Sequence, residues 1–533
     1  MIELKKRWKA AGAACLFLLL ALAVLPGLTR KQTEEKEERD PDAVSIWYPG
    51  GYEILSNMEL NDVWAVEEME NRLDVSLDFS GNTGDLDSSF QTLLLDLSGT
   101  DAVFYRFSAE QLRSMAENGQ ALDYTPYLDQ MPNLKKRFAE NPLLYQYASV
   151  DGQCLFFPSL VENSYQDILL GIRKDWLDQV GADKPESVEK LAEILLRQKN
   201  LYAQGELENQ GEYFIGLSSY NEYANQLMRV FGTDSGVYWN EEKTGLVYGP
   251  ATEEYRNYLI FLKSLYQAEM LDAGLYETET TDFEKYFLNN MSSTILTTGE
   301  QAQKLEKYAA ANGDDIILEY VNLDTLSGET PAIYRTAHRQ NQVLEYGFVI
   351  NADISQEKLD MLLKMIDYLY SDEGMELMNW GLEGKHWIME NGERVYNPDC
   401  IEDGEYYAIA MARYLKQDML CTDRTANRNM LDSDVRAAVD EASYQEDYSF
   451  DEPRGYYTKE QEDRLDTLEI SLGTFVEETT MNFIYSSIDP SDDGDWQDYL
   501  DTLESFGMEE YLEIQLDAWE RMQLRQYEGG EES

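Results

Sequence analysis

The chain has 533 residues, more than one hydrophobic core usually covers, so we expect at least two lobes. Apolar and aromatic residues make up 43% of it and recur in patterned segments, which excludes a disordered protein. The formal charge of −59 would repel phosphate backbones and anionic surfaces, so nucleic acid is not an expected partner. We interpret this charge first as a solubilising surface and only second as a field that steers a ligand.

The first 28 residues predict a targeting segment. Basic residues between Lys5 and Lys9 precede an uncharged stretch from Ala10 to Leu28, which is about the length that spans a bilayer. Basic residues stay on the cytoplasmic side, so the remainder is expected outside the cytoplasm. A cleaved signal peptide and an uncleaved transmembrane anchor both fit, and Cys15 precedes the leucine-rich stretch, so lipidation is not expected. Residues 29–43 predict a charged linker.

Residues 44–119 predict alternating strands and helices. VSIWYPGGY from Val44 predicts a strand that runs into a glycine-rich turn, and the apolar spacing in DVWAVEEMENRL predicts an amphipathic helix. VSLDF from Val75 predicts a second strand. This strand, helix, strand order favours a parallel pair with a right-handed crossover. DAVFYRF and the segment that ends at Gly119 predict another strand and helix.

Later segments continue the alternation. ILLGI from Ile168 predicts a strand, and Asp175 is expected to cap a helix that starts at Trp176. Thr252 is expected to open a long helix, and EYGFVI predicts a strand followed by another amphipathic helix. From Thr458 onward the pattern is helical, up to an acidic end.

Five segments resemble, in the correct order, the family 1 extracellular solute-binding proteins, and most closely the long subgroup that serves oligosaccharide import in Gram-positive bacteria. They are IRKDWLDQVGADKPESVEKLAEIL, GLVYGPATEEYRNYLIFLKSLYQAEML, YGFVINAD, YLYSDEGMELMNWGLEGKHW and SSIDPSDDGDWQDYLDTLESFGMEEYLEIQLDAWERM. The resemblance covers nearly the whole chain after Ala43. The chain departs from the family's usual pattern because it lacks a lipobox.

The resemblance implies an α/β fold of the two-lobed, periplasmic-binding-protein-like type II, in which each lobe is a mixed sheet flanked by helices, with extra helices at the C-terminus. We expect residues 44–160 and 313–375 to form lobe 1. Residues 161–312 and 376–525 are expected to form lobe 2, and residues 526–533 a disordered acidic tail.

The resemblance also implies a function. An oligosaccharide would be captured in the cleft between the lobes and delivered to the permease of an ABC transporter. The protein would be a monomer, either anchored on the extracellular face of the cytoplasmic membrane or secreted, and would act without catalysis, cofactor or metal. The alternative is a membrane-anchored sugar sensor without a transport role, which the missing lipobox favours. A secreted glycosidase is a third reading.

Candidate ligand contacts in lobe 1 follow strands, because ligands of open α/β sheets lie beyond the carboxyl ends of strands. Tyr suits this role, since its ring covers C–H faces and its hydroxyl pairs with sugar hydroxyls, and the chain has 37 Tyr against 18 Phe. Tyr48 and Tyr52 follow the first strand, and Tyr105 with Arg106 ends the strand in DAVFYRF. The resemblance places sugar contacts in both stretches. Trp47, inside the first strand, is expected to pack in the core.

Candidate contacts in the second lobe rest on the resemblance. Tyr220, Asn221 and Tyr223 match the family region that stacks on the sugar and bonds it. Arg173 and Trp176 could bind the ligand, although Arg173 could also pair with neighbouring carboxylates. Trp380, Glu383 and Trp387 lie with His386 in a glycine-punctuated loop that resembles a G-x-E-G segment, where contact with the ligand and packing at the hinge are both open.

The sequence offers few residues for catalysis or metal binding. With only His338 and His386, histidine-based triads and histidine-rich zinc sites are not expected. DPSDDGDW from Asp489 lacks EF-hand spacing, so we expect it to cap a helix and not to bind calcium. No nucleotide-binding motif is present. The cysteines Cys400 and Cys421 could form a disulfide in an oxidising compartment.

Overall fold

A computed structural model describes residues 42–50, 58–81, 85–164, 168–219, 221–240, 244–272, 274–275, 280–314, 316–327, 342–402, 407–441 and 455–523. The predicted targeting segment 1–28, most of the predicted linker 29–43 and the predicted tail 526–533 lie outside these ranges. The compact body of the chain begins at Val44. Among the described helices, none combines the length and the apolar character that a membrane span requires.

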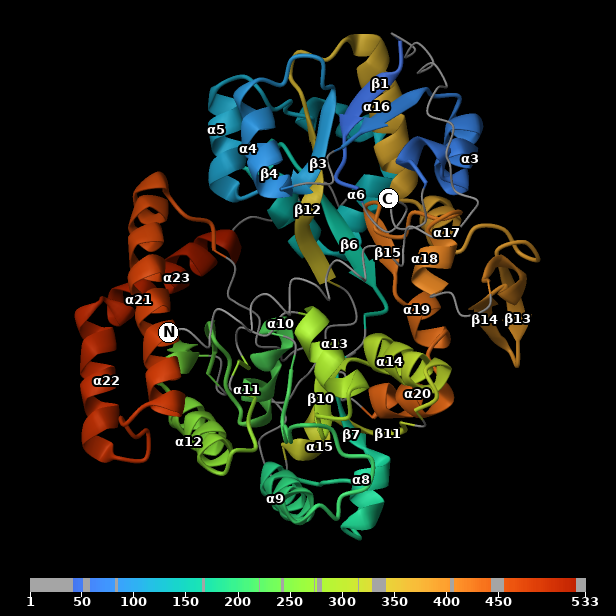
Figure 1. The fold of residues 1–533 in the computed structure, drawn as a ribbon. Helices are drawn as coiled ribbons and strands as arrows, with labels where there is room; N and C mark the ends of the chain where they lie inside the picture. Colours follow the sequence, from blue (N-terminus) through green and yellow to red (C-terminus); the bar gives the residue numbers. More distant parts are fainter. Residues whose placement is uncertain are drawn as a thin grey trace, which may run out of the picture. The chain divides into compact units, whose positions relative to one another are not determined.

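The first sheet has six strands, and all but one run in the same direction. Their order is β15 (Cys421–Asp423), β6 (Phe157–Glu162), β12 (Gln342–Ile350), β3 (Ala102–Arg106), β1 (Val44–Trp47) and β2 (Leu77–Ser80) (Figure 1). β1 pairs in parallel with β2 and β3, and β15 pairs in parallel with β6. β12 is antiparallel to both β3 and β6, so the other five strands end at the same edge. The predicted parallel pair of the first two strands is confirmed.

Helices and two apolar cores cover the two faces of this sheet. The helices are α3 (Trp64–Leu73), α4 (Leu86–Leu95), α5 (Ala109–Glu117), α6 (Pro132–Glu140), α7 (Pro142–Ala148), α16 (Gln356–Leu369) and α17 (Asp372–Asn379). Side chains alternate between the faces: Tyr48 and Phe104 belong to one core, and Trp47 and Tyr105 to the other. The expected core position of Trp47 is confirmed, since it is 8% exposed. We call this part the six-stranded lobe.

The second sheet has three strands and is antiparallel. β7 (Ile168–Arg173) lies between β10 (Thr294–Thr298) and β11 (Leu318–Asn322). The helices of this three-stranded lobe are α8 (Lys174–Gln179), α9 (Val188–Gln204), α10 (Asn221–Ala224), α11 (Gln226–Val230), α12 (Glu253–Gln267), α13 (Thr280–Leu288), α14 (Gly299–Ala311), α15 (Leu323–Leu326) and α20 (Ser433–Asp440). The predicted cap at Thr252 is confirmed, because its hydroxyl accepts the Tyr255 N–H at 3.1 Å. The predicted cap at Asp175 is wrong: the helix begins at Lys174.

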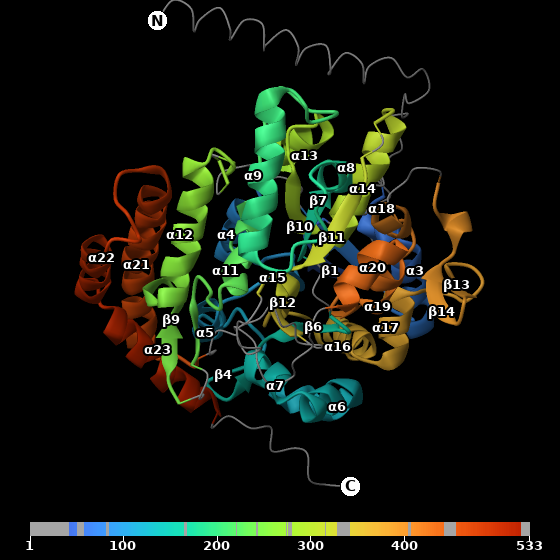
Figure 2. The same cartoon turned by 90° about the horizontal axis from the view of Figure 1, so that it is seen from below.

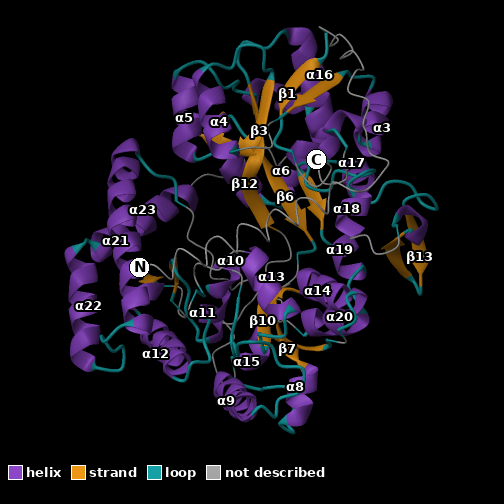
Figure 3. Cartoon of the chain, in the orientation of Figure 1, coloured by secondary structure: helices purple, strands orange, loops and turns teal. Residues whose placement is uncertain are grey.

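Short elements complete the fold. They are the hairpins β4 (Ser149–Val150) with β5 (Gln153–Cys154), β8 (Val237–Trp239) with β9 (Leu246–Tyr248) and β13 (Trp387–Glu390) with β14 (Glu393–Tyr396), and the helices α18 (Tyr407–Met411) and α19 (Thr425–Asn429). Figure 3 shows the strands gathered in these sheets and hairpins, with helices around them.

The C-terminal helices form part of the three-stranded lobe. α21 (Lys459–Tyr485), α22 (Asp493–Ser505) and α23 (Met508–Gln523) follow one another, and α21 packs along α12 (Figure 2). Phe483, Trp496 and Tyr499 lie in the same apolar core as Leu170 of β7. The Asp492 carboxylate accepts the N–H groups of Gly494 and Asp495, so the acidic DPSDDGDW segment caps α22 as predicted.

Two segments pack differently from the predicted lobe boundaries. Residues 377–426, predicted in lobe 2, supply β15 to the six-stranded sheet and side chains to its core. Residues 318–326, predicted in lobe 1, supply β11 and α15 to the three-stranded lobe. The predicted two-lobed α/β architecture with extra C-terminal helices is confirmed. The mixed sheet predicted for each lobe is found in the six-stranded lobe, whereas the described strands β10, β7 and β11 of the other lobe form an antiparallel sheet.

Gly347 tests the packing of the central strand β12. The ladder of β12 with β6 shifts register between Leu344 and Gly347, and a Cβ at Gly347 would collide with the carbonyl of Phe157. Gly347→Ala should lower the free energy of unfolding by about 1–3 kcal/mol, measured in urea. The control is Gly473→Ala in α21, where a Cβ meets open space, and it should stabilise by up to about 1 kcal/mol. Equal effects would contradict the prediction.

Candidate ligand-binding site

The edge at which β1, β2, β3, β6 and β15 end is the natural place for a ligand site. Among the described elements, the chain passes between the lobes at this edge after β6, before β12 and after β15. Loops beyond the carboxyl ends of parallel strands leave room for a ligand. The two sheets therefore meet at one edge, and we call it the crossing edge.

Polar and aromatic side chains of the six-stranded lobe stand at the crossing edge. Arg106, the last residue of β3, pairs in register with Tyr346 of β12. The side chain of Arg106 is 67% exposed and its Nε lies 3.5 Å from Glu345 Oε2, while Tyr346 is 41% exposed. The ring of Tyr105 meets that of Tyr346 edge to face at 5.8 Å. This group offers an aromatic surface next to a cation and a carboxylate.

Tyr105 supports this group from inside. It is 7% exposed, and its hydroxyl donates to Asp87 Oδ1 at 2.8 Å. Burial, with the neighbouring Asp87, raises the pKa of Tyr105 to about 12, so the phenol stays protonated at neutral pH. Tyr105 therefore packs against Tyr346 from inside, while Arg106, Glu345 and Tyr346 are the exposed members of the group.

The three-stranded lobe brings other predicted residues to its own side of the crossing edge. β10 and β11 end at Thr298 and Asn322, which pair with the start of β7. Ser219 bridges to Leu296 in β10, and α10 begins at Asn221, just beyond it. Tyr223 in α10 is half-buried. The predicted residues Asn221 and Tyr223 thus follow the bridge at Ser219, whereas Tyr52 and Tyr220 lie outside the described residues.

Tyr48 does not lie on a ligand surface. It is 3% exposed and stacks on Phe104 with ring centroids 4.5 Å apart, and the Lys416 ammonium lies 4.9 Å from its ring. Its position after the end of β1 suggested a contact, but the ring turns back into the core of the six-stranded lobe. We therefore correct the prediction for Tyr48.

Arg173 and Trp176 lie at the far edge of the three-stranded sheet. β7 starts near the crossing edge and is six residues long, so it ends roughly 17 Å away. Arg173 is 1% exposed and binds both oxygens of Asp175 and the side chain of Asn290. Trp176 is fully buried, and its indole N–H donates to the Glu208 carbonyl at 2.9 Å. The charged corner after β7 is a structural ion pair, and the predicted ligand role is wrong.

The predicted residues of the glycine-punctuated loop pack on the six-stranded lobe. Trp380 is 2% exposed and donates from Nε1 to Asp423 Oδ2 at 2.9 Å, next to the end of β15. Trp387 is 5% exposed under the guanidinium of Arg394, which lies 4.3 Å from its ring. These contacts favour hinge packing over ligand contact for both tryptophans.

Glu383 is exposed and lines a cavity of about 300 Å³. The cavity lies between α3, α17 and the β13–β14 hairpin, and its other lining residues are Arg72, Glu373, Glu376, Leu377, Gly381, Leu382, Trp387 and Arg394. Arg72 and Arg394 are held by Glu373 and Glu376 at 2.9 and 3.2 Å. The cavity lies on the flank of the six-stranded lobe. The Arg106 and Tyr346 group is elsewhere, on strands β3 and β12 in the middle of the sheet.

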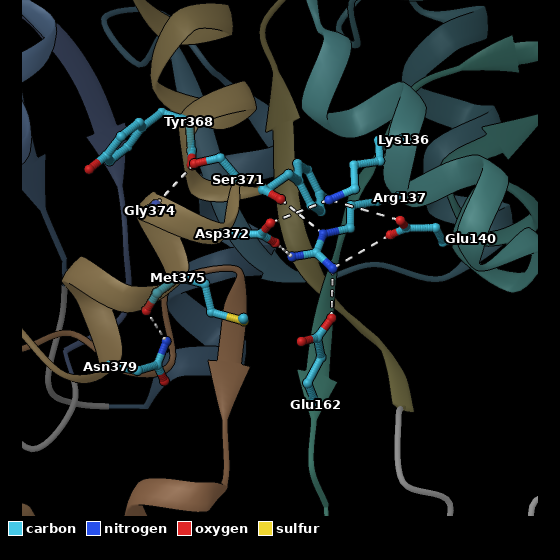
Figure 4. A network of polar contacts seen from close by, with 11 residues as sticks. Lys136, Arg137, Glu140, Glu162, Tyr368, Ser371, Asp372, Gly374, Met375 and Asn379 are labelled. Atoms are coloured by element: carbon cyan, nitrogen blue, oxygen red, sulfur yellow. Dashed lines mark hydrogen bonds and ion pairs between the residues drawn. The ribbon is translucent and has the colours of Figure 1, made fainter. Parts of the chain in front are cut away.

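A buried arginine organises the crossing edge at the end of β6. Arg137 in α6 donates to Glu162 at 2.8 Å, to Asp372 at 3.0 Å and to the Tyr370 carbonyl at 3.0 Å (Figure 4). Burial raises the pKa of Glu162, while Arg137 opposes that rise. The next strand is tied to the same place, because Arg424 N donates to the Glu162 carbonyl and Asn163 donates to Asp423 at 2.9 Å.

Two features escaped the sequence reasoning. Tyr346 lies within a predicted strand. Only the alternation of side chains between the two faces of a strand could have marked it as exposed. Trp239 in β8 and Trp519 in α23 meet edge to face at 4.6 Å, and both are half-buried. Their partnership joins residues that are distant in the sequence, so no local pattern predicts it.

Metal-ligand groups and the cysteines were the other candidate sites. They contain no group of three or more His, Cys, Asp or Glu side chains arranged to hold a metal ion. Cys400 and Cys421 are separate thiols, so the disulfide that the sequence left open is not formed. Burial raises the pKa of Cys421 to about 12, which makes it an inert thiol in the core.

No protein-family model matches the chain. Among curated proteins, the lipoprotein LipO of Bacillus subtilis (strain 168) is 21% identical over 409 residues, 73% of this chain and 75% of LipO. The fructooligosaccharide ABC transporter substrate-binding protein FusA of Streptococcus pneumoniae serotype 4 (strain ATCC BAA-334 / TIGR4) is 22% identical over 570 residues, 97% of this chain and 99% of FusA.

Solved structures share the fold. The alginate-binding protein AlgQ2 without calcium ion superposes with a TM-score of 0.67 at 14% identity, over 90% of this chain and 97% of AlgQ2. FusA in complex with kestose superposes with a TM-score of 0.64 at 17% identity, over 90% of this chain and 99% of FusA. The chain is thus similar in sequence to a curated ABC transporter substrate-binding protein, and it shares the fold of solved oligosaccharide-binding proteins. The resemblance predicted from the five sequence segments is thereby confirmed.

Substitution of Arg137 tests the packing at the crossing edge. Arg137→Met removes the cation between Glu162 and Asp372 and leaves the Tyr370 carbonyl without its donor, so we expect a loss of about 3 kcal/mol in unfolding free energy. The control is Lys136→Met, next in the chain, whose exposed pairs with Asp372 and Glu140 should cost about 0.5 kcal/mol or less. Urea unfolding measures both, and equal losses would refute a special role for Arg137.

The buried His386 should make the free energy of unfolding depend on pH. Its Nδ1 accepts the Leu382 N–H at 3.1 Å, and burial, assisted by Lys385, lowers the pKa of His386 to about 4. The unfolded chain binds a proton near pH 6.5, so this contribution is complete above pH 6.5 and is lost as the pH falls toward 4. Between pH 7 and pH 4.5 the native protein should lose about 2–3 kcal/mol more than His386→Asn, measured in urea. Parallel losses in both proteins would contradict the assignment.

Proposed function

We propose that this chain is an extracytoplasmic solute-binding protein that captures an oligosaccharide between its lobes and delivers it to the permease of an ABC transporter. The observation that carries the proposal is the exposed group of Arg106, Glu345 and Tyr346 at the edge where the chain passes between the lobes. The relatives add support, because FusA is named as a fructooligosaccharide-binding protein. LipO is named as a lipoprotein, which fits a location outside the cytoplasm.

The chemistry of the group suits a sugar. The exposed Tyr346 ring can cover a C–H face, and Arg106 and Glu345 can donate to and accept from neighbouring hydroxyls. Across the crossing edge, Tyr223 of α10 offers a second ring. We propose Arg106, Glu345, Tyr346 and Tyr223 as ligand contacts, with Tyr52, Tyr220 and Asn221 kept as predictions from the sequence. Tyr48, Arg173, Trp176, Trp380 and Trp387 are not included, because their side chains are buried.

The ligand is proposed to be neutral. The formal charge of −59 opposes an anionic chain, and the described cations nearest the crossing edge are already engaged, Arg106 with Glu345 and Arg137 with Glu162. AlgQ2 is named for an acidic polysaccharide, so the fold itself does not decide this point. A thermal-shift screen of neutral and uronate oligosaccharides decides it. Tighter binding of uronates would overturn the proposed neutrality alone, and stabilisation by neither class would overturn the sugar ligand.

The proposed location is the outer face of the cytoplasmic membrane. The 28-residue amino-terminal segment would hold the protein there if it is not cleaved, and the charged linker would let a monomer reach the permease. The missing lipobox also favours a second candidate function, a membrane-anchored sugar sensor. Sequencing the mature amino terminus and testing uptake of the ligand by cells without the permease would separate the two.

Substitution of Tyr346 tests the proposed site. The ligand is first identified by mass spectrometry of the oligosaccharide that co-purifies with the protein. Tyr346→Ala should then weaken its binding about tenfold, which is ~1.4 kcal/mol, because the aromatic face is lost. Tyr308→Ala is the matched control: this tyrosine of α14 is 43% exposed and distant in the fold from the crossing edge, so affinity should not change. Isothermal titration calorimetry measures both, and unchanged affinity for Tyr346→Ala would remove Tyr346 from the site.

A further inference from the structure

The C-terminal helices are rigidly fixed to the three-stranded lobe. The buried Lys263 of α12 donates to the carbonyls of Phe483 and Ile488 at 2.9 and 2.6 Å. Tyr255 of the same helix bonds Thr480, and Tyr499 of α22 donates to the Pro250 carbonyl at 3.1 Å. An ammonium group with this many carbonyl partners in a buried position holds its surroundings in one arrangement. The helices α21 to α23 therefore move with the three-stranded lobe.

The other end of this helical unit contacts the six-stranded lobe. Arg113 of α5 forms a salt bridge with Glu462 in the first turn of α21 and donates to the Tyr457 carbonyl at 3.1 Å. Asp151, in the turn between β4 and β5, receives Arg113 Nε at 3.1 Å and donates its own N–H to the Tyr456 hydroxyl at 3.0 Å. Each of these contacts uses at least one side chain, from Arg113, Asp151, Glu462 or Tyr456.

The Arg113–Glu462 pair is well shielded from water. The two side chains are 13% and 10% exposed, whereas most ion pairs among the described residues include at least one widely exposed partner. Burial raises the pKa of Glu462 and Arg113 opposes that rise, with Glu110 and Asp151 as the nearby carboxylates. A shielded pair loses more free energy on separation than a surface pair does.

The pair lies away from the passages between the lobes that the described elements make at β15 and α19. Figure 1 shows α21 and α23 on the opposite side of the fold from β15 and α19, and Figure 2 shows the same for α19. Lobes that pivot about a few connecting segments move most at the positions farthest from those segments. Any change in the angle between the lobes must therefore stretch or break the contact between Arg113 and Glu462.

We propose that Arg113 and Glu462 form a latch that holds the two lobes at the spacing seen in the structure, and that its release lets them pivot about the crossing edge. Tyr456 seals the latch, because its ring packs against the core of the six-stranded lobe and its N–H donates to the Ala518 carbonyl of α23 at 2.8 Å. The proposal concerns the free protein and does not depend on the identity of the ligand.

The test measures the spacing of the lobes in the full chain. Spin labels are placed by Glu357→Cys on the exposed face of α16 and by Lys190→Cys on the exposed face of α9, with Cys15→Ser and Cys400→Ser to prevent other labelling. Double electron–electron resonance gives the distance distribution without ligand. Glu462→Gln should raise the population at altered distances about tenfold, the effect of ~1.4 kcal/mol, because the neutral amide lacks the charge that holds Arg113.

The matched control is Arg464→Gln, two residues further in α21. Arg464 pairs with Glu510 inside the helical unit, and both side chains are more than 40% exposed, so the distance distribution should equal that of the native protein. Glu462→Asp keeps the charge but shortens its reach, and it should give an intermediate distribution even if Glu462→Gln folds poorly. A native distribution in folded Glu462→Asp and Glu462→Gln would overturn the latch.

Discussion

The structure depends on a buried guanidinium at the end of one strand. Arg137 is 7% exposed and links α6 to Glu162 at the end of β6 and to the start of α17. Removing a guanidinium from water costs free energy unless its N–H donors find hydrogen-bond acceptors. Here three different parts of the chain supply oxygen acceptors to Arg137. The chain leaves the six-stranded sheet at the same point. The site where the lobes connect is therefore also the site where the first lobe is most firmly tied together.

This arrangement explains why the ligand surface lies beside the connections and not on them. Glu162 and Asp423 end adjacent strands, but their carboxylates are occupied by Arg137, Asn163 and Trp380. In the middle of the sheet, the exposed side chains are Arg106 at the end of β3 and Tyr346 in β12. Arg106 and Tyr346 can bind a ligand because both stay exposed, although Arg106 has Glu345 as its ionic partner.

Local sequence patterns predicted the elements well and the directions of strands poorly. The parallel pair of β1 and β2 and the cap at Thr252 follow from residues close together in the chain, so they were predictable. Arg173 and Trp176 were misplaced because the side of the sheet at which β7 ends depends on its strand partners. β7 pairs with β10 and β11, more than 100 residues away, and both partners are antiparallel to it. Nothing near Arg173 in the sequence specifies those partners.

The aromatic composition misled for a related reason. An excess of Tyr over Phe predicts rings that need a polar partner, but the fold can supply that partner from its own backbone. Tyr124 and Tyr370 are buried and donate to the carbonyls of Phe156 and Pro158 at 2.8 and 2.6 Å. A tyrosine therefore marks a ligand site only where its ring stays exposed after the sheets are assembled. Tyr346 meets that condition because its place on β12 is fixed by pairing with Arg106, and its ring leans on Tyr105 from one side while the other side faces solvent.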